Sequence, residues 1–309
     1  MPAAEFTEDY RFLSRSERLS HDEIFRVASI AVGLGVTKLR ITGGEPLLDK
    51  NAVSLVSRLA ALPCLDDLAL TTNGVLLAPM AQSLADAGLH RVTISLDSID
   101  ETVFTQMSGG RGDLGKVFAG IEAAERSGLS PIKINVVVQR GVNDNGVLDV
   151  LERFRGTGHI VRLIEFMDVG SRNGWSLDQV VPSKEILKCI QAKWPLRAVG
   201  RNYPGEVASR YQYLDGEGEV GFISSVTEPF CGNCSRARLS ADGTLYTCLF
   251  ATDGTNLRGF LREGEDDAAI AAALTKIWTG REDRYSESRA PASVEVPLVN
   301  KVEMYRMGG

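Results

Sequence analysis

From about residue 38, short apolar runs alternate with stretches whose apolar residues recur at helical spacing. In the stretch 114–128, one helical face carries Val117, Phe118, Ile121 and Ala124. The runs predicted to be strands are Lys38–Thr42, Leu68–Thr72, Arg91–Leu96, Ile132–Gln139 and Ile160–Phe166. The intervening helices include Asn51–Leu62, Pro79–Gly88 and Leu114–Gly128. Apolar strands that alternate with helices at spacings of about 25 to 35 residues predict a parallel sheet built from the β/α units of a barrel.

Small and polar residues follow several of these strands: Gly43-Gly44-Glu45-Pro46, Thr71-Thr72-Asn73-Gly74, Ser95-Leu96-Asp97 and Met167-Asp168. Each alone is typical of an ordinary strand-to-helix turn. The carboxyl ends of barrel strands form one active-site face. Four such ends in succession therefore predict a shared site.

After about residue 170 the alternation fades, which predicts a partial β/α barrel over 1–170 and a smaller region over 171–309. In that region we expect a helix at Pro182–Trp194, a turn and strand at Gly216–Ser225, and a final helix that contains Ile270–Trp278. The fold class is thus α/β, with an incomplete barrel and a smaller C-terminal region.

Composition and charge exclude several classes of protein. The chain is 44% hydrophobic and 24% charged, as in ordinary globular proteins, and its net charge of -6 argues against a general nucleic-acid binder. No apolar run approaches the roughly 20 residues of a membrane span, and the first residues are polar, so a cytoplasmic location is expected. The segment Gly110–Lys116 has P-loop spacing, but Val117 stands where that motif needs Ser or Thr.

Cys231, Cys234 and Cys248 form the clearest chemical motif. Two cysteines at this short spacing can hold one metal centre, and Asp242-Gly243 supplies a hairpin turn that returns the third. Three cysteines without an obvious fourth ligand suit an iron–sulfur cluster with one open iron, although structural zinc remains an alternative. The other two cysteines, Cys64 and Cys189, have apolar neighbours and are expected to pack in the core.

Four basic residues could bind an anion. Arg236 and Arg238 directly follow the second cysteine, and guanidinium groups pair with phosphate in a bidentate fork, but a solvated strand face would look the same. Arg40 lies near a strand end, and Lys133 interrupts an apolar run, where an unpaired buried charge is costly.

Together these motifs, with Ile164-Glu165-Phe166-Met167-Asp168-Val169-Gly170 and the terminal Gly308-Gly309, resemble the GTP 3',8-cyclase family. This family, also called molybdenum cofactor biosynthesis protein A, consists of radical S-adenosylmethionine (SAM) enzymes. The resemblance extends from Met1 to Gly309 and implies cyclisation of GTP to (8S)-3',8-cyclo-7,8-dihydroguanosine 5'-triphosphate. It also implies a homodimer whose product passes to the cyclic pyranopterin monophosphate synthase.

The resemblance assigns roles to matching positions. It implies that SAM is contacted by Gly44, Ser95 and Met167. It implies that GTP is contacted by Arg40, Thr71, Lys133, Arg236, Ala237 and Arg238. A C-terminal [4Fe–4S] cluster, whose open iron binds the purine, would be held by Cys231, Cys234 and Cys248.

One family feature does not occur in the 309 residues: the Cys-x3-Cys-x2-Cys loop whose cluster reduces SAM. The family's last cysteine of that loop is followed by Met-Pro, and this sequence begins Met1-Pro2. We therefore expect an N-terminally truncated chain that cannot bind the SAM cluster and is inactive. The alternatives are a non-catalytic fragment that binds one cluster and GTP, and a zinc-stabilised domain.

Overall fold

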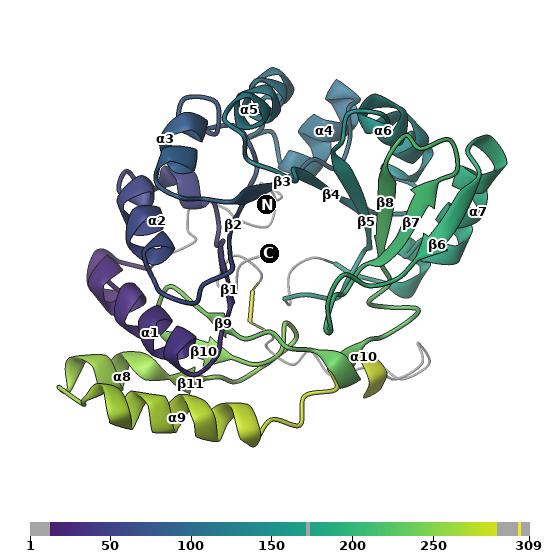
Figure 1. Ribbon diagram of the computed structural model, residues 1–309. Helices are drawn as coiled ribbons and strands as arrows, with labels where there is room; N and C mark the ends of the chain where they lie inside the picture. Colours follow the sequence, from purple (N-terminus) through teal and green to yellow (C-terminus); the bar gives the residue numbers. More distant parts are fainter. Residues whose placement is uncertain (1–12, 171–173, 289–301, 304–309) are drawn as a thin grey trace.

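The computed structural model describes residues 13–170, 174–288 and 302–303, so the Gly308-Gly309 pair lies outside the described residues. Its main feature is an eight-stranded sheet in the order β1-β2-β3-β4-β5-β8-β7-β6. The strands are β1 (Lys38–Ile41), β2 (Asp67–Thr72), β3 (Arg91–Ser95), β4 (Lys133–Val138), β5 (Ile160–Glu165), β6 (Leu196–Val199), β7 (Ser209–Tyr213) and β8 (Glu219–Ile223). The sheet curves strongly, with helices on its convex side (Figure 1). The predicted α/β partial barrel is confirmed.

All five predicted strands form, and each is parallel to its neighbours from β1 to β5 and on to β8. The strands β6 and β7 join the edge in antiparallel fashion. The helices around the sheet are α1 (His21–Gly33), α2 (Ala52–Ala60), α3 (Ala81–Asp86), α4 (Glu101–Ser108), α5 (Leu114–Arg126), α6 (Val147–Phe154) and α7 (Ser183–Lys193). The segment before the P-loop-like Gly110–Lys116 is therefore a helix, α4, where a P-loop would need a strand.

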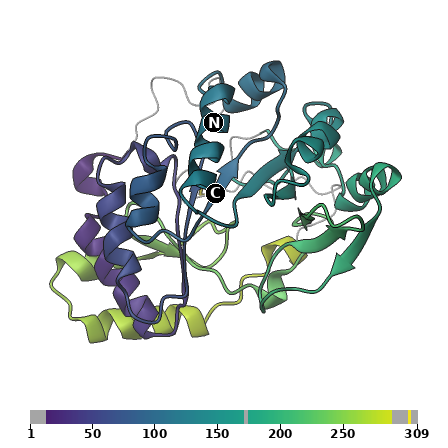
Figure 2. The same ribbon diagram turned by 45° about the horizontal axis from the view of Figure 1, so that its top comes forward.

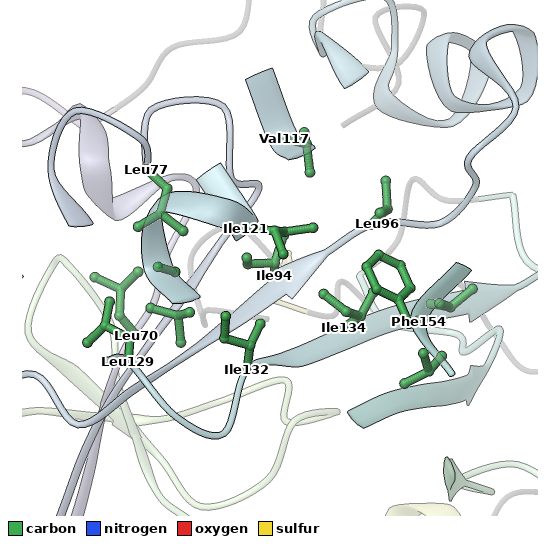
Figure 3. Close-up of a cluster of buried hydrophobic side chains, with 14 of the residues drawn as sticks. Leu70, Leu77, Ile94, Leu96, Val117, Ile121, Leu129, Ile132, Ile134 and Phe154 are labelled. Atoms are coloured by element: carbon green, nitrogen blue, oxygen red, sulfur yellow. The ribbon is translucent and has the colours of Figure 1, made fainter. Parts of the chain in front are cut away.

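The two faces of the sheet differ in chemistry because side chains alternate along each strand. In β4, Ile134, Val136 and Val138 are buried in the main core, whereas Lys133 and Asn135 are half-buried on the concave face. Figure 3 shows Leu70, Ile94 and Ile134 from the sheet beside Leu77, Val117 and Ile121 from the convex side. The concave face is thereby left for polar side chains.

The fully buried Glu165, at the end of β5, connects the sheet to the chain that follows it. Its Oε1 accepts hydrogen bonds from the backbone N and Oγ of Ser183, at 2.9 and 3.0 Å, and from Thr227 Oγ1 at 2.5 Å. Its Oε2 accepts from the backbone N atoms of Val226 and Thr227, both at 2.9 Å. One carboxylate therefore joins the end of β5, the start of α7 and the segment that leads to Cys231.

The sheet does not end at residue 170, since β8 pairs with β5 and brings β7 and β6 with it. The reason is that α7, which was predicted at Pro182–Trp194, serves as the crossover that a parallel β5–β8 pair requires. The division into 1–170 and 171–309 stays a prediction about domains and is not a boundary of the sheet.

A second core joins the two ends of the chain. It contains Leu19 and Val27 from the α1 region together with Leu257, Leu261, Ile270 and Leu274. The last four come from α8 (Leu257–Arg262) and α9 (Asp267–Thr279), which lie beside α1 in Figures 1 and 2. Arg26 and Arg262 reinforce this contact through ion pairs with Asp267 and Glu23.

A small antiparallel sheet, in the order β11-β10-β9, carries the cysteine motif. Its strands are β9 (Arg238–Leu239), β10 (Thr244–Tyr246) and β11 (Thr255–Asn256), and α10 (Tyr285–Ser288) follows α9. The predicted hairpin at Asp242-Gly243 joins β9 to β10. Among the described helices, none combines the length and the apolar character needed to cross a membrane.

Candidate active site

A group of cations lies on the concave face, and we call Arg40, Lys133 and Arg162 the concave-face cations. Arg40 Nη1 donates to Thr71 Oγ1 at 2.8 Å and to Thr93 Oγ1 at 3.0 Å. Arg162 donates from Nε to Asn135 Oδ1 at 2.9 Å and from Nη2 to the same Thr93 oxygen at 3.4 Å. Strand register explains the convergence, since Thr71 pairs with Thr93 and Thr93 pairs with Lys133.

These cations carry an electrostatic cost that the hydroxyl groups do not remove. Burial, followed by the repulsion of Arg162 and Arg91, lowers the pKa of Lys133 to about 8. Burial and neighbouring cations also lower the pKa of Arg40 to about 10 and that of Arg162 to about 9. Such shifts indicate a site that lacks negative charge, and a bound anion would restore the charged forms.

The nearest carboxylates are largely committed to other partners. Asp67 accepts from Arg91 Nε at 2.9 Å and forms an ion pair with the same guanidinium. Glu206 attracts Lys133 and Arg162, and it also accepts the backbone N–H of Asn202 at 2.6 Å. This leaves the concave face with an excess of positive charge, which suits a polyanion such as a triphosphate.

The glycine motif after β1 lies against the Thr-Thr-Asn motif after β2, and Glu45 joins them. Its Oε1 accepts from Thr72 Oγ1 at 2.7 Å, and its Oε2 accepts from the backbone N of Asn73 at 2.7 Å. Gly44 is exposed, and no atom lies within 4 Å of the position that a Cβ would occupy there. Gly43 has φ +147°, which disfavours a side chain. The turn therefore presents open backbone to a ligand.

The other two residues assigned to SAM also lie at strand ends. Ser95 is the last residue of β3 and is exposed. Met167 is half-buried and is the second residue after the end of β5. Gly44, Ser95 and Met167 thus end different strands of one parallel sheet, at its carboxyl edge, as the sequence predicted.

Cys231 begins a 3₁₀ turn, Cys231–Asn233, Cys234 follows that turn directly, and Cys248 lies on the chain after β10. Arg236 Nη2 lies 3.2 Å from Cys234 Sγ, and the backbone N of Phe250 lies 3.4 Å from Cys248 Sγ. Burial lowers the pKa of Arg238 to about 10, whereas the charges of Cys234 and Cys248 act to raise this pKa. Arg238 is therefore within electrostatic reach of two of the three thiols, while Ala237 between the two arginines is exposed.

The thiols respond differently to their surroundings. Burial acts to raise the pKa of Cys234, but Arg236 and Arg281 outweigh it and hold this pKa below its usual value. Burial, Asp283 and Cys231 raise the pKa of Cys248. A cationic centre bound to all three would favour the thiolate form throughout.

The donors around Cys234 bear on the choice between a cluster and a zinc ion. Within the described residues, no three His, Cys, Asp or Glu side chains lie close enough together to hold a single metal ion. In addition, Arg236 Nε and Arg281 Nη1 are buried without a partner among the described atoms. Unpaired buried N–H groups beside Cys234 would find acceptors in the sulfurs of an iron–sulfur cluster, so this donor set fits a cluster better than one ion.

The expectation that Cys64 and Cys189 pack in the core is wrong, since both are exposed. Cys64 occupies a turn with φ +67°, between α2 and β2. Cys189 lies on α7, whose buried face is formed by Ile186 and Ile190. Apolar neighbours in sequence misled the prediction, because a helix turns adjacent residues to different faces.

Two residues near these sites were missed by sequence reasoning. Arg162 carried the same signal as Lys133, a charge inside the apolar run 160–166, and could have been found in that way. Arg281 gave no signal, because it reaches Cys234 from a segment 47 residues along the chain. The predicted residues fall into two groups, with Arg40, Thr71 and Lys133 on the concave face and Arg236 and Arg238 beside the cysteines.

Comparisons with known proteins agree with this geometry. Residues 5–154 match the family model described as Radical SAM superfamily, and residues 159–287 match that described as Molybdenum Cofactor Synthesis C. A GTP 3',8-cyclase from Xanthomonas axonopodis pv. citri is 53% identical over 310 residues, covering 100% of this chain and 91% of that protein. One from Staphylococcus carnosus is 41% identical, with the same coverage.

Solved structures with lower identity support the fold alone. Streptococcus suis SuiB has a TM-score of 0.55 at 12% identity, over 84% of this chain and 59% of that one. Native anSMEcpe with bound AdoMet has a TM-score of 0.52 at 17% identity, over 79% and 68%.

The same comparisons bear on the expectation of a truncated, inactive chain. The cyclases align with all of this chain, which gives that expectation no support.

The pKa of Lys133 predicts how polyphosphate binding depends on pH. Only the protonated amine attracts an anion, so affinity for tripolyphosphate should fall as pH rises through about 8. We expect Lys133→Arg to flatten this fall, because a guanidinium keeps its charge. Calorimetry from about pH 6.5 to about 8.5 measures the affinities of wild type and variant for tripolyphosphate. Their ratio is compared across pH, because protonation of the ligand affects both affinities equally. A ratio that does not change with pH would contradict a role for Lys133.

The cysteine geometry predicts iron content. After anaerobic reconstitution, the 309 residues should bind about four irons per chain. Replacing Cys231, Cys234 or Cys248 by Ser should abolish this binding, whereas the exposed Cys64→Ser is the matched control and should retain it. Metal and sulfide analysis measures the outcome, and stoichiometric zinc without iron would refute the cluster.

Proposed function

The chain belongs to the GTP 3',8-cyclase family of radical SAM lyases, and from this premise we propose how its own residues bind and cyclise GTP. The family acts in molybdenum cofactor biosynthesis. The product would be (8S)-3',8-cyclo-7,8-dihydroguanosine 5'-triphosphate. Concave-face cations would hold the triphosphate, the cysteine region would hold the purine, and the strand ends between them would hold SAM.

The observation that carries the proposal is that two clusters of basic side chains, one on the concave face and one beside the cysteines, have too few carboxylates nearby to neutralise them. The concave-face cations have lowered pKa values and hydroxyl partners, as a binding site for triphosphate requires. Thr71 orients Arg40 through a 2.8 Å hydrogen bond, so its guanidinium is held before the ligand arrives. Preorganised charged donors lose little freedom when they bind phosphate.

The second group supports recognition of the base. Three thiols provide three ligands to a [4Fe–4S] cluster, which leaves one iron open to a purine nitrogen or oxygen. Arg236 and Arg238 both lie near Cys234, and both would add donors to the ligand that the cluster holds. Ala237 between them would contribute only its backbone, since its side chain is a methyl group.

At the strand ends, the chain supplies close approach and orientation. Gly43-Gly44 lets a ligand pack directly on the backbone, and Glu45 fixes that turn against Asn73. Ser95 offers a hydroxyl at the end of β3, and Met167 offers an apolar surface after β5 at the same edge of the sheet. SAM bound there would supply the radical that removes a hydrogen atom from the GTP ribose, once the cluster of the family's Cys-x3-Cys-x2-Cys loop gave it one electron. The protein holds that carbon near purine C8 so that the new bond forms within one bound substrate.

We expect Arg238→Ala to weaken GTP binding by about 1.5–3 kcal/mol, the usual contribution of a charged hydrogen bond to a buried partner. Arg153→Ala is the matched control, because Arg153 lies on α6 over the ring of Phe118 and far from the cysteines in sequence. Calorimetry on the anaerobic, iron-loaded protein measures both affinities. Equal losses from the two substitutions would show that Arg238 contributes only general surface charge.

Cyclisation is tested separately from binding, by measuring the products. Under anaerobic conditions with GTP, SAM and a reductant, a cyclase forms 5'-deoxyadenosine in proportion to the cyclised nucleotide. In a preparation that carries the family's Cys-x3-Cys-x2-Cys loop together with these 309 residues, we expect both products to depend on Lys133 and Arg238 and to exceed a blank without iron. Bound GTP and about eight irons in that preparation, with neither product formed, would contradict cyclisation and would leave a binding protein.

A further inference from the structure

The segment 281–287, which we call the clamp, lies against the cysteine turn, with α10 beside the 3₁₀ turn at Cys231–Asn233. Arg281 Nη2 donates to the backbone O of Cys234. Glu287 Oε1 accepts the backbone N–H of Gly232 at 3.1 Å. Asp283 Oδ2 accepts from Thr247 Oγ1 at 2.5 Å, next to Cys248. Three clamp side chains therefore bond to a cysteine or to its immediate neighbour.

Tyr285 ties the clamp to the sheet. Its hydroxyl donates to Asp168 Oδ2 at 2.6 Å, and its ring stacks on Phe250 with centroids 4.8 Å apart at 21°. Asp168 follows Met167, and Phe250 lies two residues after Cys248. The clamp thus connects the cysteine region with the strand end where SAM is proposed to bind.

Arg281 has a further property. Its Nη1 is buried and has no hydrogen-bond acceptor among the described residues. The guanidinium lies 4.1 Å from the centroid of the Trp278 ring, which restricts its orientation. A buried charged donor without an acceptor costs free energy, so a ligand beside Cys234 that offers an acceptor would remove this cost.

We propose that Arg281 is a positioning residue of the cluster, which donates its free N–H to a cluster sulfur while the clamp holds the three cysteines in place. The inference rests on the proposed function, because it requires the cluster. It concerns a residue other than Arg236 and Arg238, which face the substrate in that proposal. Its chemical basis is that a cluster sulfur is a good acceptor for a charged N–H.

Two consequences follow for the cluster. Hydrogen bonds to cluster sulfurs stabilise the more negative, reduced state, so Arg281 raises the reduction potential. The contact with the Cys234 carbonyl and the bonds from Glu287 and Asp283 hold the ligand turn, so they slow iron loss. Outer-sphere partners of this kind typically change metal affinity by about 10-fold to 100-fold.

The test compares the iron-loaded wild type with Arg281→Ala and Arg281→Lys. We expect Arg281→Ala to lower the ratio of reduced to oxidised cluster at a fixed potential by about tenfold, or about 59 mV for a one-electron couple. Iron transfer to a chelator should become about tenfold faster. Arg281→Lys keeps one cationic donor and should restore part of both properties. Redox titration followed by electron paramagnetic resonance measures the first effect, and chelator kinetics measure the second.

Arg284→Ala is the matched control, because it removes the same charge only three residues after Arg281. The side chain of Arg284 is exposed, and its 3.5 Å ion pair with Glu287 contributes little. This substitution should leave the potential unchanged. A wild-type potential in fully loaded Arg281→Ala overturns the inference alone, as does an equal shift in Arg284→Ala. If Arg281→Ala loads no iron, Arg281→Met, which keeps an unbranched stem but has no donor, takes its place, and a wild-type potential in that variant overturns the inference. A wild type that binds no iron overturns the proposed cluster, and this inference with it.

Discussion

The buried carboxylate of Glu165 is the interaction on which the geometry of the site depends. A carboxylate with no exposure to water is tolerated only if its oxygens are hydrogen-bonded, and five donors satisfy Glu165. Those donors belong to the start of α7 and to residues 226–227, so the charge of one residue determines where the chain leaves the sheet. The cysteines begin four residues after Thr227, and Met167 lies two residues after Glu165. Their relative position therefore follows from this one network.

The same balance between burial and charge shapes the ligand sites. Arg40, Lys133 and Arg162 carry more positive charge than the nearby Glu206 can neutralise, and the thiol of Cys234 has unpaired guanidinium N–H groups near it. A protein without a ligand bears this imbalance as a loss of stability. An anion bound to the concave-face cations and a cluster bound to the cysteines would remove this imbalance. Part of the affinity for each ligand therefore comes from charges that the protein buries without partners.

Much of the fold could be predicted from the sequence, because short apolar runs in the strands and helical spacing in α5 leave clear patterns. The strand ends could be predicted as well, since parallel strands place Gly44, Ser95 and Met167 at one edge without any knowledge of loops. Other features could not be predicted. The continuation of the sheet through β8 depends on pairing between β5 and a strand about 60 residues later, and the network of Glu165 involves residues 18 to 62 positions away. Arg281 reaches the cysteines through tertiary contacts alone, and the exposure of Cys64 and Cys189 depends on which face of a turn or helix meets the core.

The second core has a consequence for how the protein is made. Leu19 and Val27 are among the first described residues to leave the ribosome, but their partners on α8 and α9 are synthesised more than 200 residues later, and the Arg26–Asp267 pair spans 241 positions. During translation the apolar face of α1 stays uncovered until the chain is nearly complete, a period in which chaperones have access to it. The cysteine turn lies between these two halves of the contact in sequence. Its final enclosure by the clamp must therefore follow synthesis of α9, which leaves an interval in which the thiols are open to solution.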